Sequence, residues 1–218
     1  IAGGSKENLT INTMGVATVS GAVGPDIGTL TVTQSGGTTF ESTVNADVLT
    51  ITDTADGATI LFEDDLTVNT GMTVGANGGY NVSLTGGLND ISGGTSFLNS
   101  GTVTLGDATG DTTTFTGGVT ATAPSMKNIA GTIRATDNDI NLGVSAVTVT
   151  DSATLGSGTG AITLGAVTIS GEGDTLTIGE GGDSLISLMS VIGIAGGSKE
   201  NLTINTMGVA TVSGAVGT

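Results

Sequence analysis

GTLTVT at residues 28–33 and LGAVTISG at residues 164–171 carry the pattern that decides the fold. In both, a hydroxyl residue stands between two aliphatic residues, as in Leu30-Thr31-Val32. Alternation with a period of two places the aliphatic side chains on one face of a strand and the hydroxyls on the other. The β-branched residues Val, Ile and Thr also favour strands over helices. The pattern therefore predicts short β-strands that each bury one face.

The same triplet recurs throughout the chain, and several of its copies are about twenty residues apart. Clusters such as Ser35-Gly36-Gly37 and Asn77-Gly78-Gly79 separate the triplets and predict tight turns. This spacing is typical of one coil of a β-solenoid with two or three short strands. We therefore predict an all-β parallel β-helix with irregular coils of about twenty residues. Nine or ten such coils would make up one repeat period, with a length of about 45 Å. The triplets are Leu9-Thr10-Ile11, Leu30-Thr31-Val32, Leu49-Thr50-Ile51, Leu66-Thr67-Val68, Met72-Thr73-Val74, Val82-Ser83-Leu84, Val103-Thr104-Leu105, Val147-Thr148-Val149, Ile162-Thr163-Leu164, Val167-Thr168-Ile169 and Leu176-Thr177-Ile178.

The two ends of the chain share one sequence. IAGGSKENLTINTMGVATVSGAVG occupies residues 1–24 and returns without substitution at residues 194–217, an offset of 193 positions. The next position differs, with Pro25 after the first copy and Thr218 after the second. We interpret residues 1–193 as one tandem repeat period and residues 194–218 as the start of the next, a near-identical copy of residues 1–25. An engineered duplication of the ends is the alternative.

The composition excludes several classes of site and partner. Twenty acidic residues against four basic ones give a formal charge of −16, which repels nucleic-acid phosphates and anionic membranes. We therefore expect no nucleic-acid partner and no membrane insertion. The chain has no Cys and no His, so disulfides, Ser-His-Asp triads and His- or Cys-based zinc sites are excluded. Aromatic residues make up only 2% of the chain, which indicates a narrow core of stacked aliphatic layers.

Two segments depart from the triplet pattern. Pro124–Ile129 contains Lys127, has Arg134 close behind it, and spaces its apolar residues almost as a helix would. A short helical turn and a protruding loop are both compatible with it, and we expect an ordinary coil corner. Leu185–Ile192 is the most apolar run, and periodicity does not decide between a buried strand pair and a helix of two to three turns.

We predict no catalytic residues. The run Glu63-Asp64-Asp65 offers carboxylates, but consecutive strand residues point to opposite faces, so we expect a solvated edge or turn. A solenoid enzyme that works with carboxylates would need a groove lined by three or more acidic side chains.

Calcium is the one cofactor candidate, because it binds carboxylate and carbonyl oxygens. Asp174 and Asp183 stand nine residues apart in Gly-rich segments, a spacing found in calcium-binding β-rolls. Asp137 and Asp139 begin a segment like an EF-hand loop, but Leu142 stands where that loop requires Gly. Turn-forming Asp and Asn side chains explain both segments equally well.

The texture of Gly28–Thr33 and Thr163–Gly171 resembles the long β-strand-repeat proteins of bacterial surfaces, namely autotransporter passengers and filamentous-haemagglutinin-type adhesins. The resemblance covers most of the chain and is compositional. It implies a right-handed β-helix, secretion to the cell surface, and a role in filaments, adhesion or motility-linked structures. It transfers no binding residue.

Three functions fit this fold. The first is a structural segment of a long extracellular fibre on a bacterial surface, whose partner is itself through end-to-end continuation of the repeats. The second is the stalk of a large adhesin, where any host or cell-surface ligand binds outside this chain. The third is a trimeric phage-type or cell-surface fibre in which three chains share one core. Bead-like immunoglobulin domains are the alternative fold, and the missing Trp argues against them.

Overall fold

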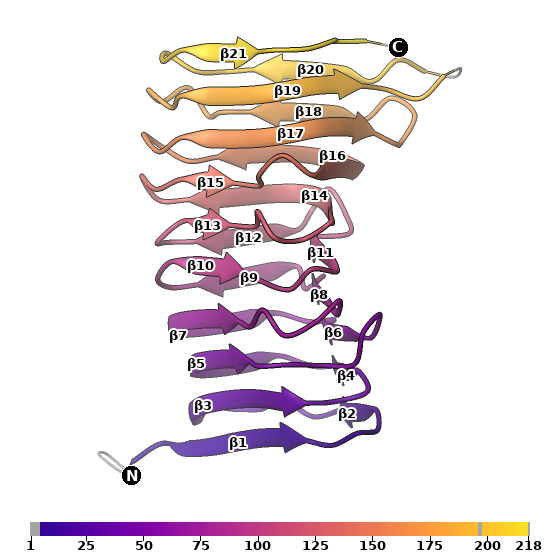
Figure 1. Cartoon of the computed structure of the whole chain (residues 1–218). Helices are drawn as coiled ribbons and strands as arrows, with labels where there is room; N and C mark the ends of the chain where they lie inside the picture. The colour runs from indigo at the N-terminus through magenta and orange to yellow at the C-terminus, as the bar shows by residue number, and fades with distance from the viewer. Residues whose placement is uncertain (1–4, 196–197, 218) are drawn as a thin grey trace.

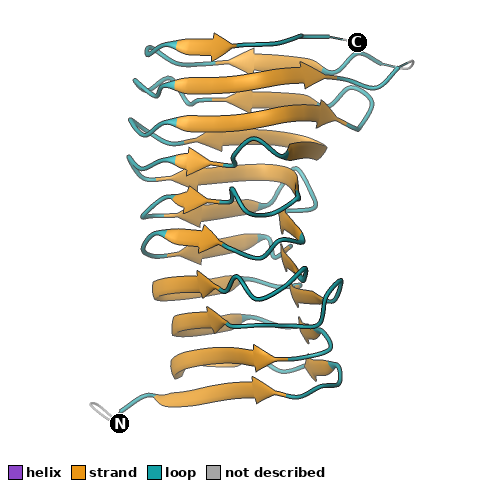
Figure 2. Ribbon diagram, in the orientation of Figure 1, coloured by secondary structure: helices purple, strands orange, loops and turns teal. Residues whose placement is uncertain are grey.

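The computed structural model describes residues 5–195 and 198–217, and every regular element within them is a β-strand. The strands pair in parallel and stack as a solenoid of about nine turns, which confirms the predicted parallel β-helix (Figure 1, Figure 2). In Figure 1 the front strands run from left to right while the chain climbs from the N-terminus, and the chain returns behind them. The coil is therefore right-handed, the hand that parallel crossovers favour. The described residues contain no helix of the length and apolarity needed to cross a membrane.

Each turn passes over three faces, which we name A, B and C in the order in which the chain visits them. Face A contains β1 (Glu7–Asn12), β10 (Thr95–Phe97), β13 (Val119–Thr120), β15 (Ile140–Asn141), β21 (Ala210–Val212), the later parts of β3 (Val23–Gln34), β5 (Val44–Ile51) and β7 (Leu66–Val74), and the earlier parts of β17 (Ile162–Ile169) and β19 (Ile186–Ile192). Face B contains β2 (Ala17–Val19), β4 (Thr38–Phe40), β6 (Thr59–Phe62), β8 (Asn81–Leu84), β11 (Thr102–Leu105), the earlier parts of β14 (Met126–Ala135) and β16 (Ala146–Gly156), and the later parts of β17 and β19. Face C contains β9 (Leu88–Ile91), β12 (Thr112–Phe115), β18 (Thr175–Ile178), β20 (Asn201–Ile204), the earlier parts of β3, β5 and β7, and the later parts of β14 and β16.

The strand pairing fixes the length of each turn. Nine successive pairings along face A lead from Leu9 to Ala210, an average of about 22 residues per turn. Individual turns differ in length, because Leu30 pairs with Leu49 only 19 positions later whereas Leu176 pairs with Leu202 after 26. The irregular coils predicted from the sequence are confirmed, and their mean length is slightly greater than twenty residues.

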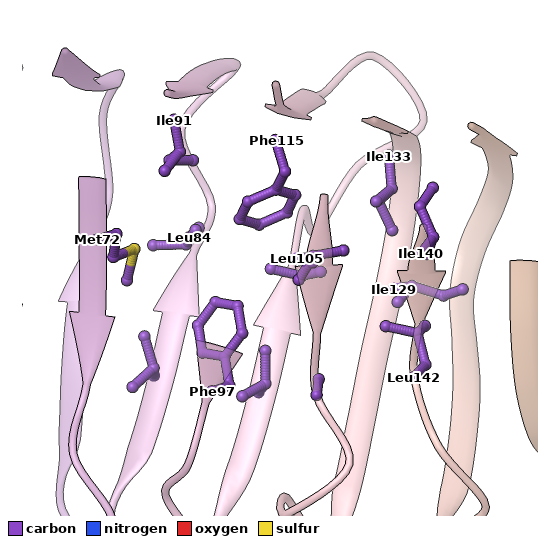
Figure 3. Close-up of a cluster of buried hydrophobic side chains, with 14 of the residues drawn as sticks. Met72, Leu84, Ile91, Phe97, Leu105, Phe115, Ile129, Ile133, Ile140 and Leu142 are labelled. Carbon is purple, nitrogen blue, oxygen red and sulfur yellow. The ribbon is translucent and has the colours of Figure 1, made fainter. Parts of the chain in front are cut away.

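The core is a continuous column that the three faces enclose. The aliphatic members of the triplets point inward from each face and stack on their counterparts one turn away (Figure 3). On face B, for example, Leu84, Leu105 and Ile129 follow one another in register, and none of them is exposed. The few aromatic residues also lie inside, and the rings of Phe40 and Phe62 stack with centroids 4.7 Å apart. Each turn thus buries its apolar face against its own other faces and against both neighbouring turns.

Neither atypical segment forms a helix. The coil corner expected at Pro124–Ile129 is found only at Pro124 and Ser125, because Met126–Ile129 is the start of β14 and pairs with both β11 and β16. The near-helical spacing was misleading, because Lys127 takes an inward place that Val103 and Val147 hold in the two neighbouring turns. Leu185–Ile192 lies mostly in β19, which bends from face A onto face B and so serves as two short strands in sequence.

Candidate functional site

Two of the calcium candidates lie in the turn between β14 and β15, at the corner from face C to face A. One carboxylate oxygen of Asp137 accepts hydrogen bonds from the backbone N–H and the hydroxyl of Thr159, at 3.1 and 3.2 Å. One oxygen of Asp139 accepts a hydrogen bond from the N–H of Ala161 at 2.8 Å. Asp137 has a φ of 53°, a conformation that Asp tolerates better than most residues. Both side chains therefore tie one corner to the corner of the next turn.

The fold does not bring the other two candidates to this turn. Asp174 lies at the corner from face B to face C, where one of its oxygens is 3.4 Å from the hydroxyl of Ser152. Asp183 is exposed in the connection between β18 and β19. Within residues 5–195 and 198–217, no three acidic side chains come together in a group that could hold a metal ion. Calcium binding at the corner of Asp137 and Asp139 is the subject of the measurement that follows.

We expect calcium to leave the melting temperature unchanged, because carboxylate oxygens of Asp137 and Asp139 already accept hydrogen bonds from the next turn. Asp139→Ala should lower the free energy of unfolding by about 1 kcal/mol, the net value of a lost hydrogen bond, equally in EDTA and in millimolar calcium. Scanning calorimetry in the two buffers measures both effects. A calcium-dependent rise in melting temperature that Asp139→Ala abolishes would show instead that the corner is a calcium site.

The acidic run Glu63-Asp64-Asp65 forms the turn between β6 and β7, as predicted. One carboxylate oxygen of Asp65 accepts a hydrogen bond from the N–H of Leu88, one turn further along, at 2.8 Å. One oxygen of Asp64 accepts the N–H of Asp65. This run therefore shapes a corner and links it to the next turn.

Lys127 is a buried titratable group that the sequence did not reveal as such. It points inward from β14 between Val103 and Val147 of the neighbouring turns, and its side chain has no exposed surface. Its Nζ atom lies 2.6 Å from the hydroxyl of Ser145 and 3.4 Å from the carbonyl of Pro124. Burial lowers the pKa of Lys127, because desolvation penalises the ammonium form. The only sequence signal was its place in the alternation M-K-N-I, two residues before the inward Ile129.

The pair of Lys127 and Ser145 has the residue types of a base and a nucleophile, but its geometry is that of an internal tie. The Ser145 hydroxyl donates a hydrogen bond to the carbonyl of Pro124 at 2.8 Å, so its proton is already engaged. The ammonium group is enclosed by the core and contacts that same carbonyl. The arrangement fastens the corner before β14 to the corner before β16.

Lys127→Met should stabilise the protein by about 1–3 kcal/mol at neutral pH, because it removes a buried ammonium and keeps the length of the side chain. Since the folded-state pKa lies below the ordinary value of 10.5, the wild-type chain binds fewer protons when folded than when unfolded. Wild-type stability should therefore rise with pH between those two values, and the advantage of the variant should shrink. Chemical unfolding from pH 7 to pH 11 measures this.

Lys199→Met is the matched control, because Lys199 is exposed. We expect it to change stability by less than about 0.5 kcal/mol at every pH. A Lys127→Met variant that is less stable than the wild type across the whole range would contradict the assignment.

Face A carries a single unbroken row of short polar side chains that pair from turn to turn. Charged side chains are sparse, and the ion pairs of Lys6 with Asp47 and of Arg134 with Glu180 each reach across an intervening turn. In the second pair, Gly156 lies opposite Arg134 on that turn, and a side chain there would collide with Glu180. The row on face A is Thr10, Thr31, Thr50, Thr73, Ser96, Thr120, Asn141, Thr163, Ser187 and Thr211.

The two ends of the solenoid are the surfaces with unused bonding capacity. Among the described strands, β1 and β2 pair only with the turn that follows them, and β20 and β21 pair only with the turn that precedes them. Unpaired strand edges are templates for further strands. The strands at both ends come from the same repeated sequence, residues 1–24 and 194–217. These edges are therefore the candidate functional site.

Searches of protein-family models, curated proteins and solved structures find no match to this chain.

Proposed function

We propose that this chain is a structural segment of a long tandem-repeat extracellular fibre on a bacterial surface, and that it is not an enzyme. The proposal rests on the position of the second copy of the repeat in the solenoid. Strands β20 and β21 belong to that copy, and they continue the solenoid by parallel pairing with β18 and β19. The start of a new period thus needs no linker and no separate domain. The partner of the segment is the next copy of its own sequence.

The remaining features fit a rod. One period of nearly nine turns adds about 42 Å of length at a strand spacing of about 4.8 Å. The formal charge of −16 keeps such a rod soluble and discourages lateral association. The polar row on face A offers neither charge nor aromatic surface to a small ligand. The resemblance to bacterial surface repeat proteins supplies the expectation of an extracellular location.

A single-chain fibre is favoured over a trimeric one by the core. Inward side chains from all three faces are buried within one chain, as for Leu30, Phe62 and Ile91, none of which is exposed. A shared trimeric core would leave one apolar side of each chain open. An adhesin stalk has the same rod and differs at its tip, outside this chain.

The proposal is tested in the source organism with antibodies against the folded chain. Immunogold electron microscopy of intact cells should label thin filaments along their length, and external protease should remove the label. Labelled filaments that end in an unlabelled head would identify the stalk of an adhesin. Label found only after the cells are broken open would contradict an extracellular fibre.

A further inference from the structure

The two copies of the repeated sequence lie on different faces of the solenoid. Leu9 is on face A, where β1 pairs with β3, and its equivalent Leu202 is on face C, where β20 pairs with β18. Ala17 is on face B in β2, and its equivalent Ala210 is on face A in β21. The described strands of the two copies, identical in sequence, therefore occupy different positions around the axis.

The displacement is one face for each strand of the copy that the structure describes. Val23 lies on face C, opposite Val44, and its equivalent Val216 lies on face B, opposite Val191. Since Leu9 and Ala210 are nine turns apart on face A and Leu202 precedes Ala210 by one face, the 193 residues of a period make eight and two-thirds turns. A period is not a whole number of turns.

The local structure of the repeat is the same at both positions. In the first copy the N–H of Gly15 donates to the hydroxyl of Thr13 at 3.1 Å, at the corner from face A to face B. In the second copy the N–H of Gly208 donates to the hydroxyl of Thr206 at 2.9 Å, at the corner from face C to face A. The sequence sets this turn, whichever corner it occupies. The repeat therefore fits more than one pair of faces.

The backbone groups used by the two copies are complementary. The backbone hydrogen bonds at corners and strand ends connect the first copy to the turn that follows it. They connect the second copy to the turn that precedes it. Among the described residues of the two copies, no donor position is shared between these two sets. The first copy donates from Thr13 to Gln34, from Ala17 to Gly37 and from Val23 to Thr43, and the second from Asn201 to Asp174, from Asn205 to Ile178, from Met207 to Gly182, from Ser213 to Leu188 and from Gly217 to Val191. One copy in the middle of an array could make both sets at once.

We propose that successive periods of the tandem array are each turned by one face, about a third of a turn, relative to the period before. The occupant of the edge formed by β20 and β21 is the continuation of the same repeat, and the array stays one uninterrupted solenoid. Three periods, which span 26 turns, bring a given residue back to the same side of the rod. This inference rests on the proposed function, because it describes how periods of the fibre follow one another.

The rotation distributes every surface feature around the rod. The hydroxyl row on face C, which includes Thr132, Thr154 and Thr177, is extended by Thr203 of the second copy. Thr203 is the equivalent of Thr10, the first member of the row on face A. The row that begins at Thr10 on face A of one period therefore begins on face C in the next period. There it extends the face C row of the period before. No side of a long rod carries all copies of any one group.

Paired cysteines test the register within this chain, which has no cysteine of its own. Thr177→Cys with Thr203→Cys places two thiols opposite each other on face C, and the pair should form a disulfide on oxidation. Ser187→Cys with Thr203→Cys is the matched test of the unrotated register, in which Thr203 would lie on face A beside Ser187. That pair should stay reduced. Thr132→Cys with Thr154→Cys, an internal pair of the same row, shows that cysteines in this geometry oxidise.

Non-reducing electrophoresis of monomeric protein, with peptide mapping, identifies the disulfide. Bridging of 177 with 203 and not of 187 with 203 supports the rotation, and the corresponding pair at the second junction of a two-period chain should behave in the same way. Bridging of 187 with 203, of both pairs, or of neither pair while the internal pair bridges, would overturn it. The result is independent of cellular location, so the proposed fibre fails or stands by its own test.

Discussion

Parallel backbone pairing between consecutive turns holds this structure together and sets the position of every side chain in it. A flat strand satisfies its N–H and C=O groups only when it has a neighbour on each side, and in this chain that neighbour is always the turn before or after. The pairing in turn holds equivalent residues in line, so that aliphatic side chains stack inside and hydroxyls stack outside. A fold held together in this way can be lengthened turn by turn, and it leaves unused backbone groups only at its two ends.

Differences in turn length are confined to the corners, because the strands stay paired from turn to turn. Turn lengths between 19 and 26 residues coexist with continuous ladders, because the extra residues lie in the connections between faces. The stacking of corners also sets local demands. Gly131 has a φ of 68°, and a side chain there would collide with the backbone carbonyl of Asp111 on the preceding turn. Side chains such as Asp65, Asp137 and Asp139 then fasten neighbouring corners through backbone N–H groups. Three of the chain's acidic residues thus contribute to the stacking of the turns.

The strands and their inward faces were predictable from the sequence, and the pairing of the strands was not. Triplets such as Leu30-Thr31-Val32 show which side chains point inward, because alternation is a local property. Register depends on the number of residues at each corner, which the sequence does not mark clearly. The burial of Lys127 was missed because it follows from the pairing of Lys127 with Val103 and Val147, and that pairing is not evident from the sequence. The repeat at the two ends predicted an array, but the face on which the second copy lies depends on the sum of all turn lengths between the copies.

In the proposed fibre, one solenoid runs without interruption through each boundary between periods. Cryo-electron microscopy of a chain with several consecutive periods tests it most directly. We expect a rod of constant width in which strands about 4.8 Å apart continue through every boundary, with each period adding about 42 Å. Separate globular beads joined by linkers, or a break in the strand ladder at the boundary, would show that the periods fold as independent units.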